Sequence, residues 1–198
     1  LLSEKTAFAR MGIAIVDEQH RFGVLQKHAF RSKGGSPHVL VMTATPIPRT
    51  LTLTVYGDLA VSVISELPPG RKPVETRAVP PKKIPGLLSF LEERMKTGER
   101  VYWICPLIEE SETLDLAAAE ARFTELRERF SAFGAGLLHG RLPNGEKETV
   151  MDGFQRGDIS LLVSTTVVEV GVDVPEATIM VVEDAVRFGL SQLHQLRG

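Results

Sequence analysis

The sequence predicts an α/β protein built from two parallel β-sheets with helices between the strands. Two observations lead to this class. Short apolar runs typical of buried strands, such as 13–16 and 101–105, alternate with amphipathic stretches typical of helices. Small polar or acidic residues follow several of these runs, and in open α/β sheets ligands bind at the carboxyl ends of the strands.

The composition narrows the class of protein further. The chain has 198 residues, of which 43% are hydrophobic and 24% charged, and this is ordinary for a globular protein of one or two domains. A net charge of −2 does not indicate a nucleic-acid binder, although a local groove can still be basic. Cys105 is the single cysteine, so the chain cannot form a disulfide framework, and we expect a buried, reduced thiol.

The first predicted strand, residues 13–16, ends at two adjacent carboxylates. Its four consecutive apolar residues indicate a strand buried on both faces. Asp17 and Glu18 should lie at its carboxyl end. Hydrolysis of a nucleoside triphosphate needs one carboxylate to hold Mg²⁺, usually through water, and a second group to orient the attacking water. The alternative is an acidic turn without chemistry, because such pairs also occur by chance.

The same pattern continues to residue 64. A helix is expected over 24–33, followed by a strand over 37–42 that ends in Thr43, Ala44 and Thr45. The two threonine hydroxyls could bond the neighbouring carboxylates and a moving element, or serve only a turn set by Pro46. A helix over 49–56 and a strand near 61–64 complete this part.

A proline-rich stretch separates this part from the rest of the chain. Six of the twelve prolines lie between positions 68 and 85, which is typical of a linker or domain boundary. We therefore expect one domain over residues 1–70 and a second over 71–198. The same stretch is the most basic of the chain, and a solvated linker is favoured there over phosphate contact.

A second α/β pattern follows the linker. Its predicted elements are a helix over 84–95 closed by Gly98, a strand over 101–105, a helix over 116–130, a strand over 135–138, a helix over 143–155, strands over 160–163 and 178–182, and a helix over 189–196. The aromatic residues of the helix over 116–130 fall at core-facing spacing, so we interpret them as core.

A phosphate-binding loop of the form G-x-x-x-x-G-K-[ST] does not occur in these 198 residues, because they contain no Gly-Lys pair. The glycines between 134 and 140 superficially match a dinucleotide fingerprint. However, the third glycine is one position late, and the glycines bracket a strand. If Asp17 and Glu18 serve a nucleotide, the phosphate loop is expected upstream of Leu1.

Strand ends in the second half carry small polar groups instead of paired acids. These groups are His139-Gly140-Arg141 and Ser164-Thr165-Thr166. Hydroxyls, backbone N–H groups and a glycine suit contacts to a nucleic-acid backbone without base reading. Further on, Gly171 permits a bend, and Asp173 is a carboxylate in apolar surroundings for which a local Asx turn is the alternative.

The order of these motifs resembles the motif series of superfamily 2 helicases. The series comprises Asp17 to His20, Thr43 to Thr45, His139 with Gly140, Thr165 with Gly171 to Pro175, and Gln192 to Gly198. Longer strings, among them Thr43 to Thr50 and Glu66 to Pro73, are similar to the RecG family of ATP-dependent DNA helicases. This resemblance covers about residues 13–198. It implies tandem RecA-like parallel-sheet domains, the first of them incomplete.

The resemblance implies a role for each matching residue. Asp17 would hold Mg²⁺ through water, Glu18 would activate water, and Gln19 and His20 would relay the state of the nucleotide. Thr43 and Thr45 would couple hydrolysis to movement. DNA contacts are implied for His139, Gly140, Arg141, Thr165 and Thr166, and nucleotide contacts for Gly171, Asp173 and Gln195.

The family implies a motor fragment of a helicase that remodels stalled replication forks and Holliday junctions in DNA recombination and repair, with ATP and Mg²⁺ as cofactors. ATP would close the cleft between the domains, and hydrolysis would reopen it. The alternative within the same class is the Mfd family of transcription-coupled repair translocases, against which Gln19 and the Pro-Pro-Gly linker argue. A non-catalytic nucleic-acid-binding module is the alternative of a different class.

The resemblance also places parts of the motor outside these residues, namely the phosphate loop, a wedge domain and the arginines that reach the γ-phosphate. Because phosphoryl transfer depends on Lys and Arg clamps, we expect no ATPase activity from residues 1–198 alone. Branched DNA is the expected partner, single-stranded-DNA-binding protein is a candidate partner, and no membrane is involved. We expect a monomer in the bacterial cytoplasm, associated with the nucleoid.

Overall fold

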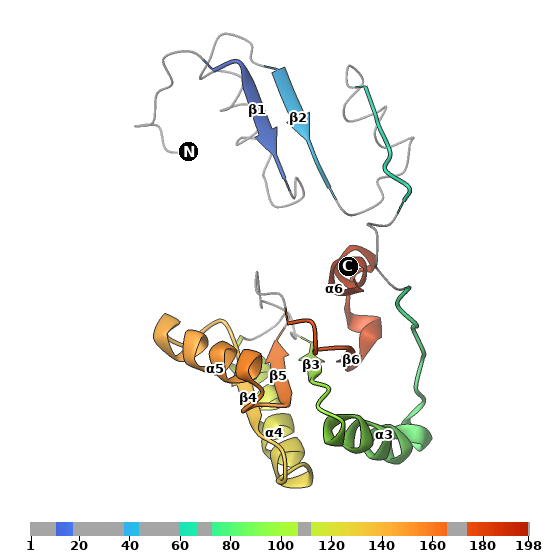
Figure 1. The fold of residues 1–198 in the computed structure, drawn as a ribbon, viewed down its shortest axis with the longest axis vertical. Helices are drawn as coiled ribbons and strands as arrows, with labels where there is room; N and C mark the ends of the chain where they lie inside the picture. The colour runs from blue at the N-terminus through green and yellow to red at the C-terminus, as the bar shows by residue number, and fades with distance from the viewer. Residues whose placement is uncertain are drawn as a thin grey trace. The chain divides into compact units, whose positions relative to one another are not determined.

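The computed structural model describes residues 11–17, 38–43, 60–66, 73–106, 112–165 and 174–197. The chain divides into two compact units, one of residues 1–74 with 190–198 and one of residues 75–189 (Figure 1). The sequence placed the boundary at residue 70 and kept the last helix with the second domain. Those domain limits stay a prediction.

The described strands of the first unit form a parallel pair, as the sequence predicts. Strand β1 (Ile13–Val16) pairs with β2 (His38–Val41), and Val16 lies opposite Val41. The pairing extends by one residue, because the Met42 N–H donates to the Val16 carbonyl oxygen at 2.8 Å. The two strands therefore end at the same edge of the sheet.

Burial on both faces of β1 was expected, and that prediction is wrong. Ala14 and Val16 are buried, whereas Ile13 and Ile15, on the opposite face, are 57% and 59% exposed. A strand is buried on both faces only where a layer covers each side of its sheet. The described residues supply no such layer on the Ile13 face.

The strand expected near residues 61–64 is also absent from the structure. Residues 60–66 are described but form no strand, and Val63 and Ile64 are 83% and 92% exposed. A run of β-branched residues raises strand propensity, but a strand also needs a pairing partner, and no described segment provides one here. The helices expected over 24–33 and 49–56 lie outside the described residues.

The second unit contains a four-stranded parallel sheet, which confirms the predicted α/β class. Its strand order is β4-β5-β3-β6, with β5 and β3 in the centre. The strands are β3 (Val101–Cys105), β4 (Ala135–Leu138), β5 (Leu161–Thr165) and β6 (Ile179–Val182). Two of the predicted strands match residue for residue. Strand β5 runs two residues beyond its predicted end, so Ser164 and Thr165 belong to the sheet.

The helices lie close to their predicted positions. They are α3 (Ile84–Lys96), preceded by the short turn η2 (Pro81–Lys83), α4 (Glu112–Arg129), α5 (Asn144–Arg156), the short turn η3 (Ala185–Arg187) and α6 (Leu190–Arg197). Glycines follow α3 and α5 in the left-handed conformation, with φ of 87° at Gly98 and 89° at Gly157. Such a conformation ends a helix at little steric cost only for glycine.

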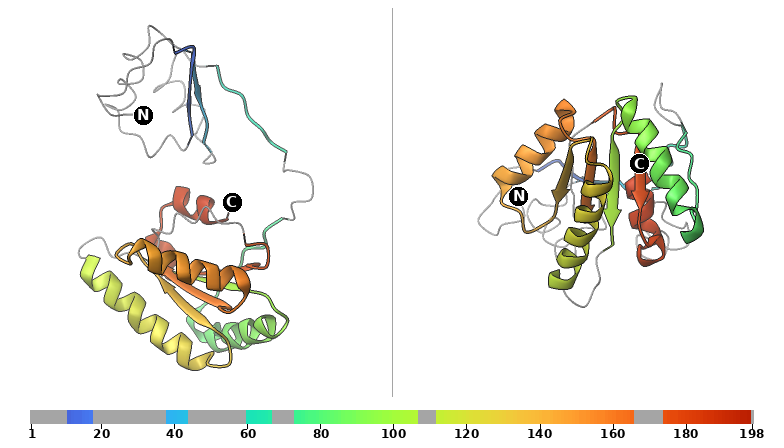
Figure 2. Two further views of the ribbon diagram at one scale, coloured as in Figure 1. Left: turned by 60° about the vertical axis from the view of Figure 1, so that its left-hand side comes forward. Right: turned by 90° about the horizontal axis from the view of Figure 1, so that it is seen from below.

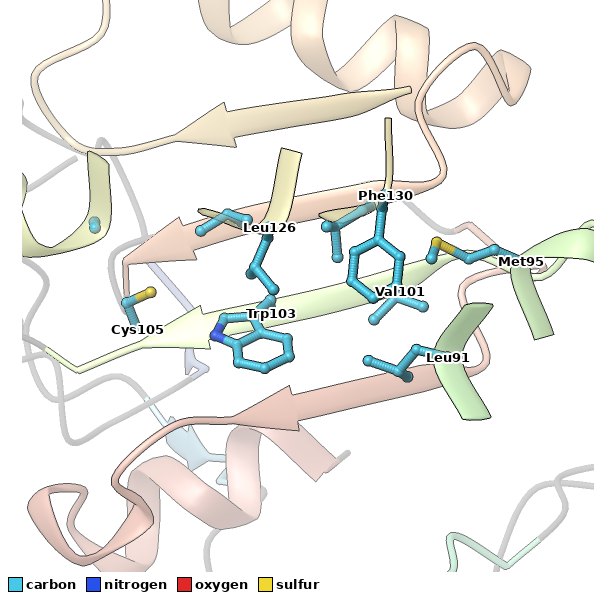
Figure 3. Packing of buried hydrophobic residues seen from close by; sticks show 10 residues of the cluster. Leu91, Met95, Val101, Trp103, Cys105, Leu126 and Phe130 are labelled. Carbon is cyan, nitrogen blue, oxygen red and sulfur yellow. The ribbon is translucent and has the colours of Figure 1, made fainter. Parts of the chain in front are cut away.

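Helices cover both faces of this sheet (Figure 2), and an apolar core lies on each face. On one face, α3 and α4 pack on β3 and β5 through residues such as Leu91, Leu126 and Phe130 (Figure 3). On the other face, Phe154 of α5 packs on the sheet, 4.8 Å from Tyr102 between ring centroids. Phe130, directly after α4, is buried in the core beneath α3 and α4, and Phe123 of α4 packs against it half-buried, as predicted. This unit is therefore a three-layer α/β structure.

Cys105 is free and buried at the end of β3, which confirms the expected reduced thiol. Burial, with a smaller contribution from the negative charge of Glu183, raises the pKa of this thiol to about 12. None of the described helices has the length and apolar character needed to cross a membrane.

Candidate functional site

The carboxyl edge of the first sheet brings two predicted site residues onto neighbouring strands. Asp17 is the residue directly after β1. Thr43 is the second residue after β2, since Met42 lies between them. Because Val16 and Val41 are paired in register, Asp17 and Thr43 lie at the same edge. Glu18, Gln19, His20 and Thr45 lie outside the described residues.

The position of Asp17 is compatible with the implied Mg²⁺. A magnesium ion bound to nucleotide phosphates takes one or two protein carboxylates and keeps several waters. Asp17 supplies one carboxylate at the edge where ligands bind in α/β sheets. Such an ion would polarise the phosphate oxygens when present.

In the second unit, four residues form a row across the carboxyl edge of the sheet. The register pairs Leu138 with Ser164, Cys105 with Thr165, and Ile104 with Val182. The four strands therefore end at about the same level. His139, directly after β4, and Glu183, directly after β6, complete the row. The carboxyl-edge row consists, in spatial order, of His139, Thr165, Cys105 and Glu183.

Alternation along the strands decides which side of the sheet this row faces. Trp103 and Val163, two residues before Cys105 and Thr165, belong to the core beneath α3 and α4. Thr165 is accordingly 4% exposed, and Ser164 on the opposite side is fully buried. The Ser164 hydroxyl donates to the Thr165 carbonyl oxygen at 2.8 Å. Because Thr165 is buried in this structure, its predicted DNA contact would require the residues that cover it to move.

The segment after β4 is more exposed than Thr165. Gly140 and Arg141 are exposed, and Lys147 of α5 donates to the Gly140 carbonyl oxygen at 2.9 Å. The Leu142 N–H donates to the His139 carbonyl oxygen at 3.2 Å, which closes a turn. Among the described residues, His139 Nδ1 is the only buried side-chain polar atom without a hydrogen-bond partner.

This turn has the features of a surface that contacts phosphates. Arg141 supplies a cation, Gly140 allows close approach of a backbone, and the N-terminus of α5 follows directly at Asn144. Exposed cations and helix N-termini both favour bound anions. Of the predicted DNA-contacting residues, Gly140 and Arg141 are therefore the ones that a ligand can reach in this structure. Thr166 lies outside the described residues.

An ion-pair network at the other end of the row was not anticipated from the sequence. The carboxylate of Glu183 accepts hydrogen bonds from the Trp103 indole N–H at 2.9 Å and from Arg122 Nε at 3.0 and 3.1 Å. Arg122 Nη2 also contacts this carboxylate. Hydrogen bonding to Glu183 raises the pKa of Arg122, although burial acts in the opposite direction. No local pattern could have paired residues 61 positions apart.

A shallow pocket of about 280 Å³ opens beside this network. Its lining includes Cys105, Pro106, Arg122, Glu183 and Arg187. A thiol with a pKa near 12 remains protonated at neutral pH, so Cys105 is not a nucleophile there. Arg122 is paired with Glu183 and Glu125, and Arg187 lies 3.9 Å from the Asp184 carboxylate, so both basic groups of the lining face carboxylates.

The remaining predicted residues divide between described and undescribed segments. Gln195 lies in α6, whereas Gly171 and Asp173 lie outside the described residues. The structure thus brings Asp17 and Thr43 to one sheet edge, and His139 and Thr165 to another.

Comparisons with known proteins agree with the motifs. Residues 82–198 match the family model of the helicase conserved C-terminal domain. The chain is 54% identical over 198 residues to the ATP-dependent DNA helicase RecG of Acidithiobacillus ferridurans, 52% identical over 199 residues to that of Bacillus subtilis, and 50% identical over 203 residues to that of Escherichia coli strain K12. Each match covers the whole of this chain and 29% of the relative. The resemblance to RecG is thereby confirmed.

Solved structures show the same relation. A structure of RecG bound to a three-way DNA junction matches the whole chain, with a TM-score of 0.70 and 43% sequence identity, and 25% of that protein is covered. A structure of Dbp5 from S. cerevisiae, bound to RNA and ADP BeF3, matches 85% of this chain and 43% of that one, with a TM-score of 0.53 at 18% identity. The second likeness shows the fold alone, and it agrees with the predicted α/β class.

Proposed function

Because the chain belongs to the family of helicases with the conserved C-terminal domain, we propose that it forms part of the motor of an ATP-dependent DNA helicase. The proposed substrates of the intact protein are stalled replication forks and Holliday junctions, which it would remodel during recombination and repair. One observation carries this proposal, namely the identity of 50–54% to RecG relatives along the whole chain. The chain spans less than a third of those relatives, so the activity is proposed for the longer protein.

The two sheet edges support separate parts of this function. In the first unit, Asp17 would hold Mg²⁺ through water, and Glu18 would orient the water that attacks the γ-phosphate. Thr43, on the neighbouring strand, would pass the state of the nucleotide to the DNA-binding parts. Phosphoryl transfer is catalysed mainly by positioning and by charge stabilisation, for which these residue types are suited.

The turn after β4 would bind the DNA backbone in the second unit. Arg141 and Gly140 are exposed, and the Lys147 ammonium holds the turn through the Gly140 carbonyl oxygen. Contacts of this kind fix the position of DNA without reading its sequence. They suit a helicase, which has to move along any sequence. Gly171, Asp173 and Gln195 would contact the nucleotide from the second domain.

Separate variants test the two edges in the intact protein. Asp17→Asn and Glu18→Gln should each lower ATP hydrolysis by about a hundredfold or more, with junction binding retained. Arg141→Ala should weaken junction binding and reduce its salt dependence by about one released counterion. The measurements are steady-state ATP hydrolysis with junction DNA, and junction binding over a salt titration. Arg156→Ala is the control, because Arg156 is an exposed cation of α5 paired with Asp158, at the opposite end of the helix from this turn.

Each outcome bears on the proposal. Junction-stimulated ATP hydrolysis that disappears in Glu18→Gln, together with branch migration by the wild type, would support a helicase. Tight junction binding by a protein without ATP hydrolysis would instead indicate a non-catalytic nucleic-acid-binding module. Displacement of stalled RNA polymerase without junction remodelling would indicate a translocase of transcription-coupled repair.

A further inference from the structure

We propose that Trp103, Arg122 and Glu183, here called the Glu183 clamp, are positioning residues that hold the start of the connection between β6 and α6. The inference rests on the proposed function, because α6 carries Gln195, to which a nucleotide contact is assigned. None of the three clamp residues belongs to the motifs that predicted the site.

The clamp ties three elements together at one carboxylate. Trp103 lies in the central strand β3, Arg122 in α4, and Glu183 directly after the edge strand β6. Glu183 accepts from the Trp103 indole at 2.9 Å and from Arg122 Nε at 3.0 and 3.1 Å, and its own N–H donates to the Ile104 carbonyl oxygen at 3.0 Å. A carboxylate held by a guanidinium fork and an indole has a narrow range of orientations.

The chain between Glu183 and α6 connects the clamp to the start of that helix. Asp184 adopts the left-handed conformation, with φ of 46° and ψ of 50°, and is the only described residue other than glycine with a positive φ. The turn η3 follows, and Phe188 is then buried at 7% exposure. The connection is thus held at Glu183 and at Phe188, whereas Val186 between them is 95% exposed. Helix α6 begins two residues after Phe188, so both points lie on the stretch of chain that leads directly into it.

Removing only one partner of the clamp is costly. Removing Arg122 or the carboxylate leaves the remaining polar group partly buried without its main partner, and this usually perturbs the structure more than loss of an exposed pair. A connection released at Glu183 would let the start of α6 shift. A displacement of about 1 Å in a catalytic constellation can lower a rate by up to about a hundredfold.

The test uses the full-length protein and separates positioning from stability. Glu183→Gln and Arg122→Met each disrupt the ion pair, and Trp103→Phe removes one donor while keeping an aromatic ring. Arg129→Met is the matched control, because Arg129 also lies in α4 and pairs through its side chain with Glu92 of α3 at 2.8 Å. The readouts are kcat and KM for ATP with saturating junction DNA, junction affinity, base pairs unwound per ATP, and the thermal midpoint.

We expect Glu183→Gln and Arg122→Met to lower kcat by about tenfold, with KM and junction affinity changed by less than about twofold. The double variant should be no worse than either single one, because both remove the same interaction. Trp103→Phe should lower kcat less than the other two variants and keep the fold. It therefore tests the inference even if Glu183→Gln or Arg122→Met does not fold. Arg129→Met, which removes a more exposed pair, should lower the thermal midpoint by no more than the clamp variants do and leave kcat near the wild-type value.

Two results would overturn the inference. One is a kcat that stays at the wild-type level in the clamp variants, including Trp103→Phe. The other is an equal loss of kcat in Arg129→Met, which would make the effect a general loss of stability. Failure of the proposed function would look different from both results. The wild-type protein itself would then show no ATP hydrolysis that is stimulated by junction DNA and abolished by Glu18→Gln.

Discussion

At the scale of single residues, burial decides which polar groups can take part in chemistry. Thr165 and Cys105 lie next to each other in the carboxyl-edge row, at 4% and 5% exposure, whereas Gly140 and Arg141 are exposed. A hydroxyl or thiol that water cannot reach is also out of reach of a ligand until its neighbours move. Among the described residues of this edge, the turn after β4 is therefore more accessible to a ligand than Thr165 or Cys105.

The Cys105 thiol should be unreactive in the folded protein. Its pKa is raised from 9.0 to about 12, so the fraction of thiolate at pH 8 is lower than in the unfolded chain by about a thousandfold. We expect modification by iodoacetamide to be slow in buffer and to accelerate as the pH rises toward 12. Labelling followed by mass spectrometry, with the same chain in guanidinium as control, measures this. Equal rates in the two conditions would contradict the prediction.

At the scale of elements, close backbone approach explains why certain positions are glycine. A Cβ built on Gly134 would lie 1.8 Å from the Asp158 carbonyl oxygen, whereas a Cβ on Gly145 would meet nothing within 4 Å. The first glycine precedes β4 beside the turn that follows α5, and the second lies exposed at the start of α5. The two positions therefore tolerate a side chain very differently.

Gly134→Ala and Gly145→Ala should change stability in opposite directions. Forcing a methyl group against backbone at residue 134 should cost about 1–3 kcal/mol or more of the free energy of unfolding. Alanine at residue 145 should stabilise α5 by up to about 1 kcal/mol, because glycine is a poor helix former. Urea unfolding of both variants measures the difference. A destabilised Gly145→Ala with an unchanged Gly134→Ala would show that the backbone path in this region is different.

At the scale of the whole molecule, these 198 residues contain some of the motifs that the proposed motor would need for nucleotide hydrolysis and lack others. It carries the acidic and threonine motifs and the matched helicase domain, but no Gly-Lys pair for a phosphate loop. It also spans only about a quarter to a third of the relatives it matches. Nucleotide hydrolysis needs the phosphate loop and the acidic motif together.

Residues 1–198 produced alone should therefore not hydrolyse ATP above background. The reason is that phosphoryl transfer depends on a lysine that cradles the phosphates, and this sequence has none in a phosphate-loop context. Phosphate release with and without junction DNA measures this, with Asp17→Asn as the control. Hydrolysis by the chain that is sensitive to Asp17→Asn would contradict the prediction, since the acidic motif would then act without the loop.

The sequence by itself determined what depends on neighbouring residues. The periodicity of apolar residues predicted the helices and strands of residues 84–197 closely, and the polar residues after each apolar run marked the carboxyl edges. Helix and strand patterns are local, with periods of 3.6 and 2.0 residues, so they can be read without knowing the fold.

Only the tertiary structure decided what depends on distant partners. The apolar run at 13–16 was expected to be covered on both faces but is covered on one, and Ile64, in a β-branched stretch, pairs with nothing described. Likewise, Arg122 and Glu183 meet because the sheet places β6 beside β3 beneath α4. Which face is covered and which charges become neighbours follow from strand order and register, and these are set by packing over the whole unit.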